Sequence, residues 1–594
     1  MSDMVNVKIN GFAVQVPKGT SILEAARAAS VTIPTLCYLK DINEIGACRM
    51  CIVEAAEMRG PNLGPARMVA ACVYPVSEGM EVQTNSPKVL DSRRKTMELL
   101  LSNHDMKCLS CVRSKNCELQ RLANDLGITD ADVYKGERTE YPIDDSAAHM
   151  YRDNNKCILC RRCVAACAVT QGIGVIGANE RGFITNIGSQ FNKGLGETAC
   201  VSCGQCIVVC PTGALSEKDY TDPVFKAIAD PTKHVVVQTA PSVRAGLGEM
   251  FGYPIGTNVE GKMVAALRRL GFDVVTDTNY GADLTIMEEG TELIERVTNG
   301  GVLPMITSCS PGWVKFCEHY FPDLIPNLST CKSPQQMQGA VTKTYFAEKM
   351  GIDPKDIVSV SVMPCTAKKF EIGRDDQAAA GPGMPDLDIS ITTRELGYLI
   401  KKSGIRFDML PDEEFDDPMA DDTGAGVIFG ATGGVMEAAV RTANAWLNDA
   451  TEPLELKAVR GTESIKEATV NVGGIDLKVC VASGASAAQQ VMEKVKAGNP
   501  EGWGFIEIMG CPGGCVNGGG QVIQPQYIRD TVDVKALRAK ALYDADAAMT
   551  LRMSHENPSI KKLYAEWFTE GYGKGKAHHA LHTSYVAREK YPKA

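Results

Sequence analysis

The chain of 594 residues lacks a positive charge excess, a long apolar run and an export signal. Its net charge of −10 argues against nucleic acid or an anionic membrane surface as a partner. No uninterrupted apolar run reaches the roughly 20 residues that a membrane-spanning helix needs. The first ten residues show neither a basic region followed by an apolar core nor a twin arginine. We therefore expect a cytoplasmic protein without membrane insertion.

A nucleotide-binding fingerprint is also missing. The glycine-rich stretch 430–436 has neither the lysine of a P-loop nor the GxGxxG register, and we find no flavin or NAD fingerprint elsewhere. The apolar fraction of 44% and charged fraction of 23% are ordinary for a globular protein. The length predicts several domains, because single cores seldom grow beyond roughly 250–300 residues.

Cysteine, in contrast, is abundant. There are 22 cysteines, and 15 of them come before residue 211. Disulfides are rare in a reducing cytoplasm, so metal ligation explains this number better. The cysteines divide the first 222 residues into three modules.

The first module, residues 1–82, predicts two strands (5–9 and 13–16) and a helix at 22–29 capped by Ser21, as in a β-grasp ferredoxin. Four thiolates can then hold one [2Fe–2S] cluster, from Cys37, Cys48, Cys51 and Cys72. The spacing is longer than the plant type, and the stretch 59–65 predicts a hairpin insertion. A zinc site, or simply buried thiols, is the alternative.

The second module, residues 83–123, contains a predicted helix at about 89–102 that leads to a histidine and three cysteines. These are His104, Cys108, Cys111 and Cys117. One imidazole and three thiolates can hold a [4Fe–4S] cluster, and the neutral ligand changes the cluster's charge and potential. Zinc accepts the same ligands. The acidic, polar segment 124–145 is expected to be mainly a connection.

The third module, residues 140–222, contains the spacing of bacterial two-cluster ferredoxins twice, in which the fourth cysteine of each run ligates the other cluster. One [4Fe–4S] cluster is then held by Cys157, Cys160, Cys163 and Cys210. The other is held by Cys200, Cys203, Cys206 and Cys167. Residue 168 is alanine where the short pattern has proline. With the first two modules this predicts four one-electron centres in series, leading to a buried catalyst.

Residues 223–594 read as an α/β catalytic domain. We predict a helix at 263–270 and strands at 234–238, 272–275, 357–362, 426–429 and 477–482. Three loops place cysteine beside proline or glycine, on tight turns where thiolates can reach a metal. They are Thr307–Trp313, Met363–Lys368 and Glu507–Cys515.

These loops, together with the N-terminal modules, resemble [FeFe]-hydrogenases of the large, multi-cluster type, over nearly the whole chain. Stretches 282–290, 329–334, 433–438 and 554–558 support the resemblance. It implies reversible interconversion of H₂ with protons and electrons at an H-cluster. That group is a [4Fe–4S] cubane bridged by cysteine to a diiron site with CO, CN⁻ and dithiolate ligands.

The resemblance also implies roles for individual residues. Cys365, Cys511 and Cys515 would ligate the cubane, with Cys515 as the bridge. Lys368 would hydrogen-bond a cyanide, and Met363 and Met436 would pack around the diiron unit. The family's proton path maps to Cys309, Glu289, Ser329 and Glu292.

One loop departs from the family pattern, which has two adjacent cysteines before the proline. This chain has Cys309 followed by Ser310. Strict alignment puts serine at the ligand position and cysteine at the relay position. We expect instead a small shift of the loop that lets Cys309 ligate and Ser310 relay protons. The alternative is that Cys309 remains the relay and the cubane is oxygen-ligated or absent.

Several further interpretations remain open. The electron partner is expected to be a soluble ferredoxin or a flavin and NAD(P)-binding subunit of an NAD(P)-linked or electron-bifurcating complex. There are two rival hypotheses. One is the large subunit of an NADH or formate dehydrogenase, and the other is an H₂ sensor or iron–sulfur carrier without turnover. Cys317, Cys331 and Cys480 are expected to be buried apolar residues. His578, His579 and His582 are expected on a surface helix or a segment wrapped over the catalytic domain.

Overall fold

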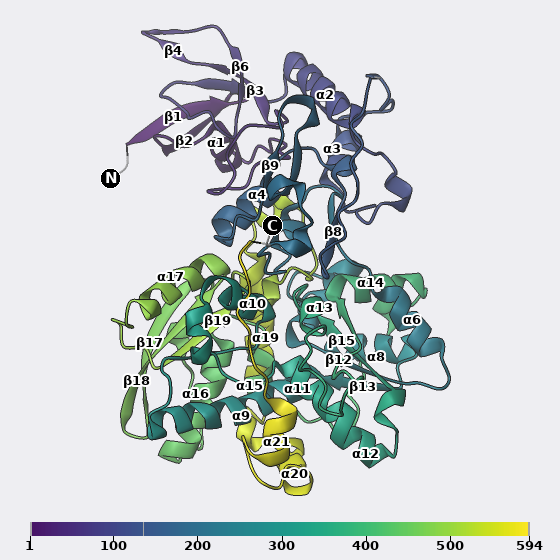
Figure 1. The fold of residues 1–594 in the computed structure, drawn as a ribbon. Coiled ribbons are helices and arrows are strands. Elements are labelled where there is room, and N and C mark those ends of the chain that lie inside the picture. Colours follow the sequence, from purple (N-terminus) through teal and green to yellow (C-terminus); the bar gives the residue numbers. More distant parts are fainter. Residues whose placement is uncertain (1–2, 135, 592–594) are drawn as a thin grey trace.

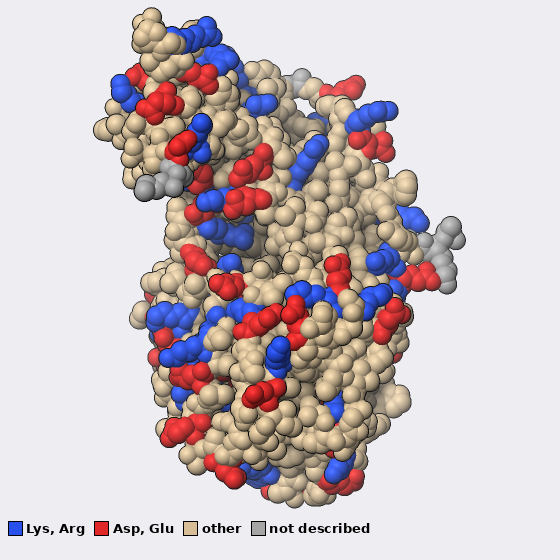
Figure 2. Space-filling model, turned by 90° about the vertical axis from the view of Figure 1, so that its left-hand side faces the viewer, with Lys and Arg blue, Asp and Glu red and all other residues tan. Residues whose placement is uncertain are grey.

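The computed structural model describes residues 3–134 and 136–591. The cysteine-rich modules lie at one end of the molecule and a two-lobed region of residues 221–591 lies at the other (Figure 1). In these residues, we find no helix with the length and apolar character needed to cross a bilayer. Acidic and basic side chains are interspersed over the face shown in Figure 2.

The first module has the predicted β-grasp arrangement. Its sheet has the order β2-β1-β7-β3-β6, and the hairpin β4–β5 projects from it. The strands are β1 Met4–Ile9, β2 Phe12–Pro17, β3 Ile52–Ala56, β4 Met58–Arg59, β5 Asn62–Leu63, β6 Arg67–Ala70 and β7 Glu81–Gln83. Helix α1 (Ile22–Ala28) begins where the Ser21 hydroxyl accepts the N–H of Glu24, at 3.3 Å. The predicted strands, helix and hairpin are confirmed.

The next two modules are mostly loops held by short elements. The predicted helix before His104 is α2 Pro87–Ser102, and α3 Glu118–Asp125 follows the three cysteines. The third module contains α4 Arg162–Ala165, α5 Gln205–Val209 and two antiparallel two-stranded sheets. One pairs β8 Met150–Arg152 with β11 Leu215–Glu217, and the other pairs β9 Ile176–Asn179 with β10 Asn186–Ser189. Residue 135 of the expected connecting segment lies outside the described residues.

Both outer modules contact the same end of the third module. The side-chain amide of Asn43 donates to the backbone carbonyls of Cys37 and Cys160, at 2.6 and 3.1 Å. From the second module, the Glu118 carboxylate binds the buried guanidinium of Arg162 at 2.9 Å. The two outer modules therefore join the third as a fork, an arrangement that the expected single series did not include. The sequence did not reveal this arrangement, because both contacts join residues that are far apart in the chain.

The catalytic region contains two sheets. The first is fully parallel, with the order β13-β12-β15-β16, from β12 His234–Thr239, β13 Val274–Asp277, β15 Ile357–Met363 and β16 Ile389–Thr392. The second has the order β14-β19-β18-β17, from β14 Met305–Ile306, β17 Ile465–Val472, β18 Ile475–Ser483 and β19 Phe505–Met509; only β17 is antiparallel. Strands β13 and β19 are buried along their whole length, as in parallel sheets that helices cover on both faces.

Central helices separate the two sheets (Figure 1). They are α9 Thr278–Asn299, α11 Pro334–Val341, α15 Gly424–Ile428, α16 Gly434–Asn448 and α19 Val534–Ala548. The strand predicted at 426–429 is wrong, because this stretch belongs to α15. A short apolar run fits a buried helix as well as a buried strand. Here Gly426 lies against α9, where an added Cβ would come 2.8 Å from the backbone oxygen of Asn279.

The remaining helices cover the sheets and the C-terminal side. They are α6 Thr221–Ala229, α7 Pro241–Arg244, α8 Glu260–Leu270, α10 Pro311–Tyr320, α12 Ala347–Met350, α13 Lys368–Glu371, α14 Thr393–Lys402, α17 Ala485–Lys496, α18 Gln526–Arg529, α20 Pro558–Glu566 and α21 Gly575–Leu581. After α21 the chain wraps over the catalytic domain. Backbone bonds from Thr583 to Thr330 and from Arg588 to Glu318, each 2.8 Å, attach it.

The third module joins the catalytic region through two close backbone approaches. A Cβ on Gly519 would lie 2.2 Å from the carbonyl oxygen of Cys203, and one on Gly204 would lie 2.4 Å from Thr366 Oγ1. The Thr366 hydroxyl donates to the carbonyl of Ser202 at 2.7 Å. Glycine is therefore required at residues 204 and 519, because a side chain would separate the two parts.

We predict that Gly519→Ala destabilises this junction. The added methyl cannot be accommodated without backbone movement, and overpacking of this kind costs about 1–3 kcal/mol. The thermal transition should therefore occur at a lower temperature in calorimetry. The control is Gly177→Ala, where a Cβ would meet nothing within 4 Å. Equal transition temperatures for the two variants would contradict the prediction.

Candidate active site and ligand sets

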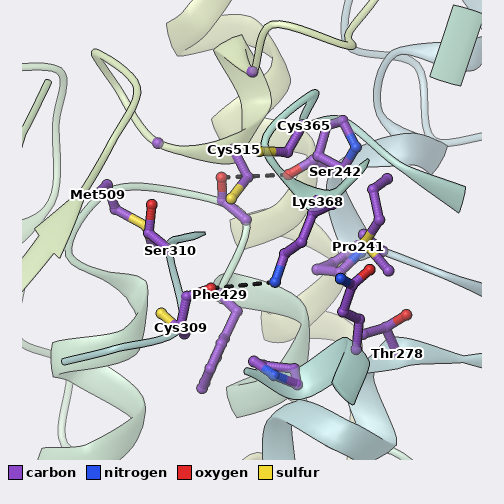
Figure 3. A pocket seen from close by; sticks show the side chains of 18 of the residues that line it. Pro241, Ser242, Thr278, Cys309, Ser310, Cys365, Lys368, Phe429, Met509 and Cys515 are labelled. Atoms are coloured by element: carbon purple, nitrogen blue, oxygen red, sulfur yellow. Dashed lines mark hydrogen bonds between the residues drawn. The ribbon is translucent and has the colours of Figure 1, made fainter. Parts of the chain in front are cut away.

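The three cysteine loops meet in one buried cavity between the two sheets (Figure 3). Cys365 follows β15, whereas Cys511 and Cys515 follow β19. Carboxyl ends of parallel strands commonly form binding sites. All three thiols line the cavity, and burial raises the pKa of each, to about 12 for Cys515. Buried thiols gathered in this way fit an iron–sulfur group, which accepts them as thiolates.

The turn that carries Cys511 and Cys515 depends on glycine. Gly513 and Gly514 have φ angles of +85° and +93°, a region that favours glycine. A Cβ on Gly514 would also lie 2.6 Å from the backbone nitrogen of Thr432. The turn can therefore pass close to the loop before α16 while both thiols face the cavity.

Lys368 places a positively charged side chain in the wall of the cavity. Its ammonium group donates to Ser333 Oγ at 2.8 Å and to Glu371 Oε2 at 2.9 Å, and it approaches the carbonyl oxygen of Cys309 at 3.3 Å. The Gln335 amide donates to the same Glu371 oxygen at 2.6 Å. These contacts fix the ammonium group at the edge of the cavity, and Figure 3 shows the one that Lys368 makes with Cys309.

Cys309 and Ser310 both line the cavity but extend in different directions from the loop (Figure 3). The Ser310 hydroxyl accepts the N–H of Gly510, the residue before Cys511, at 3.0 Å. Cys309 is partly buried, and after burial itself the charge that most raises its pKa is that of Glu289, followed by Cys515. Ser310 thus contacts the turn that carries Cys511, and the Cys309 thiol lies close enough to Glu289 for that charge to act on its pKa. Which of the two is the fourth ligand stays a prediction.

A row of polar residues leads away from Cys309 along α9. Glu289 is fully buried; burial, and then the charge of Glu292, raise its pKa to about 8. Its carboxylate oxygens have no hydrogen-bond partner among the described residues at normal distance, although Ser329 and the Ser308 backbone lie near. The Ser329 hydroxyl donates to Glu292 Oε2 at 2.9 Å, and Arg296 binds Glu292 Oε1 at 2.6 Å.

The C-terminal segment covers the outer end of this row. His582 contacts the Thr330 hydroxyl through Nδ1 at 2.7 Å and Glu288 Oε2 through Nε2 at 3.0 Å. The Cys331 thiol lies 3.8 Å from Glu292 Oε2. The expected wrapped segment is confirmed, but His582 is mostly buried and joins the network around the polar row. Cys317, Cys331 and Cys480 are all buried, as expected.

The sequence missed several cavity residues, including Pro241, Ser242, Gln335, Phe429 and Met509. Gln335 lies just after the quoted stretch 329–334, so its neighbourhood was a usable signal. The others carry no motif. Met363 lines the cavity as expected, whereas Met436 is not among the lining residues. Met436 is fully buried in the apolar cluster behind Cys515, and its N–H donates to Glu507 at 2.7 Å.

The N-terminal ligand sets also come together. Cys51 and Cys72 have sulfurs 3.3 Å apart, and the thiols of Cys37 and Cys48 contact each other. In the second module, burial lowers the pKa of His104 to about 4, so its imidazole is neutral and suited to metal ligation. In the third module, the cysteines of both runs line two adjoining cavities.

We predict that Glu289→Gln stabilises the protein increasingly as pH rises. The carboxyl pKa is raised from 4.5 to about 8 in the folded chain, so folding binds a proton and wild-type stability falls between these pH values. The glutamine variant avoids this loss, so its advantage should reach the order of 2–4 kcal/mol above pH 8. Thermal unfolding at pH 6 and pH 8.5 measures it. An advantage that is equal at both pH values, or that matches the exposed control Glu295→Gln, would contradict the raised pKa.

Five family models match successive parts of the chain. The iron-only hydrogenase large subunit, C-terminal domain, matches residues 233–519, and the iron hydrogenase small subunit matches 532–588. A 2Fe-2S iron-sulfur cluster binding domain matches 2–87, the NADH-ubiquinone oxidoreductase-G iron-sulfur binding region matches 93–132, and a 4Fe-4S dicluster domain matches 156–214.

Similar proteins cover nearly the whole chain. The NADP-reducing hydrogenase subunit HndD of Solidesulfovibrio fructosivorans is 46% identical, with 99% of this chain and 100% of that protein covered. Iron hydrogenase 1 of Clostridium pasteurianum is 43% identical, with 98% and 100% covered. Among solved structures, the apo form of a variant of [FeFe]-hydrogenase HydA1 from Chlamydomonas reinhardtii is 43% identical, with a TM-score of 0.56 over 63% of this chain and 100% of that one. The chain therefore belongs to the iron-only, or [FeFe], hydrogenase family, in its large, multi-cluster form.

Proposed function

We propose that this chain catalyses the reversible conversion of two protons and two electrons to H₂ in the cavity of Figure 3. The observation that carries the proposal is the meeting of Cys365, Cys511 and Cys515 in one buried cavity, beside a polar row that begins at Cys309. An H₂ sensor or an iron–sulfur carrier without turnover would not need such a row, so it favours turnover.

The residues around the cavity fit an H-cluster. Cys365, Cys511 and Cys515 would ligate its cubane, with Cys515 as the bridge to the diiron unit. That unit, when bound, supplies the metal centre at which H₂ is made or split. The Lys368 ammonium group, held by Ser333 and Glu371, would orient a cyanide ligand. The apolar side chains of Met363, Phe429 and Met509, which line the cavity, would exclude water.

Protons would move through the chain's own side chains. The Cys309 thiol would exchange a proton with the Glu289 carboxylate, whose pKa of about 8 keeps it available as both donor and acceptor near neutrality. Rotation of the Ser329 hydroxyl, which is bonded to Glu292, would carry the proton onward. The Glu292 side chain is 13% exposed and ion-paired with Arg296, so it would exchange protons with solvent.

We infer that Ser310 stands at the fourth ligand position and Cys309 remains the relay. This is the second of the arrangements considered for the sequence. Two observations support this inference. The Ser310 hydroxyl bonds to Gly510, the residue before Cys511, and Glu289 is the charged group with the largest effect on the pKa of Cys309.

Electrons would enter by either arm of the fork. One [2Fe–2S] and three [4Fe–4S] clusters would occupy the N-terminal ligand sets. Both arms meet at the Cys157–Cys163 run, and the Cys200–Cys206 run is the part nearest the catalytic cysteines. Because HndD is a subunit of an NADP-reducing hydrogenase, we propose a flavin and NAD(P)-binding subunit as the electron partner; ferredoxin is the second candidate.

The test uses the full chain, produced anaerobically in a host that installs the diiron group. We expect infrared bands of iron-bound CO and CN⁻ and H₂ evolution from reduced viologen. Bands without H₂ evolution would favour a sensor. Absence of both, with all N-terminal clusters present, would favour a carrier and overturn the proposal.

Substitutions at residues 309 and 310 separate the two roles. Cys309→Ser should lower turnover by at least about 100-fold while leaving the CO and CN⁻ bands, because only proton transfer is lost. Ser310→Cys should retain turnover, because a thiolate is a better iron ligand. The control is Cys317→Ser, a buried thiol on α10 that does not line the cavity. Loss of the bands in Cys309→Ser would instead make Cys309 the ligand.

A further inference from the structure

His149 is a buried histidine with no assigned task. It immediately precedes β8 and is only 1% exposed. Neither ring nitrogen has a hydrogen-bond partner among the described residues. The ring lines a cavity whose wall also contains Cys167, Cys200, Cys203 and Cys206.

An unpartnered imidazole in this position is costly. A neutral ring carries one N–H donor, and leaving it unsatisfied in the interior costs about 1–3 kcal/mol. The charged groups that act on it are the ammonium groups of Lys315, Lys218 and Lys369, none of which can accept a hydrogen bond. We therefore look for the acceptor in what the cavity holds, and the cavity wall contains a complete set of four thiols.

We propose that His149 donates an N–H···S hydrogen bond to the [4Fe–4S] cluster held by Cys167, Cys200, Cys203 and Cys206, and thereby raises its reduction potential. The inference rests on the ligand set assigned under the proposed function. A donor aimed at cluster sulfur stabilises the reduced form, which carries one more negative charge.

The neighbouring cavity provides a contrast. It contains Cys157, Cys160, Cys163 and Cys210, and the Thr212 hydroxyl and Asn154 amide in its wall are already bonded to backbone carbonyls, at 2.8 and 3.0 Å. Among its described lining residues, the one buried side-chain atom without a partner is Asn154 Oδ1, an acceptor. Among the described residues that line these two cavities, an unpartnered donor is thus found only in the cavity of His149.

The cluster that His149 would bond lies next to the catalytic cysteines. Cys203 is the cysteine of the third module whose charge couples to Cys365, and its carbonyl touches Gly519 near the catalytic turn. The same cluster would pass each electron to or from the catalytic cubane. Its potential therefore sets the driving force of the last electron step, and His149 tunes that step without touching substrate.

The test is a redox titration followed by electron paramagnetic resonance, on the full-length protein with its iron–sulfur clusters. His149→Phe keeps a ring but removes the donor, and His149→Gln keeps an N–H. We expect the phenylalanine variant to lower the reduced-to-oxidised ratio of one [4Fe–4S] centre about tenfold at fixed potential, which is 59 mV for a one-electron centre. The glutamine variant should titrate close to wild type, as should His234→Phe, whose ring lies in β12.

Two outcomes would overturn the proposal. One is a phenylalanine variant that titrates as wild type. The other is loss of the cluster from both His149 variants, which would make the ring a ligand or a packing element. The titration requires no diiron group and no H₂ turnover, so it distinguishes failure of the donor role from failure of the proposed hydrogenase function.

Discussion

The structure depends on bringing thiols from distant parts of the chain into one dry cavity. Cys365 and Cys511 are far apart in sequence, yet each directly follows a parallel strand. Parallel strands place their carboxyl ends on one side, so two sheets can present several loops to one space. The glycines at 513 and 514 then allow a turn tight enough to direct two thiols inward. The central helices hold the sheets apart at the distance that this cavity needs.

Burial disfavours the charged forms of the side chains in the site, and this effect can serve its chemistry. Desolvation raises the pKa of the catalytic thiols, so in water-free surroundings they favour the neutral form until a metal accepts them as thiolates. The same effect raises the pKa of Glu289 to about 8. A carboxyl group with a pKa near the working pH can both accept and return a proton. Low polarity around the cavity would therefore serve the proposed metal ligation and the proposed proton transfer together.

Short-range sequence patterns predicted most of the features that are formed by neighbouring residues. The cysteine runs, the β-grasp strands and the three catalytic loops were all readable because each lies within a short stretch. The features that the sequence did not predict depend on contacts between distant residues. The fork depends on Asn43 and Glu118 reaching other modules. The strand expected at 426–429 is a helix because α9 and α19 surround it. The Ser310 hydroxyl accepts a hydrogen bond from Gly510, 200 residues away. His149 carried no motif, and only its missing partners identify it.

The proposed electron and proton paths leave the cavity on different sides, and the fold explains why. The Cys200–Cys206 run meets the catalytic turn through Gly519, at the end of the molecule that carries the N-terminal modules (Figure 1). The polar row follows α9 toward the C-terminal segment, where His582 and Glu288 surround it. A carboxylate row beside the reduced clusters would add negative charge and oppose their reduction. Separate directions keep Glu289 and Glu292 from disfavouring the electron steps that the proton steps accompany.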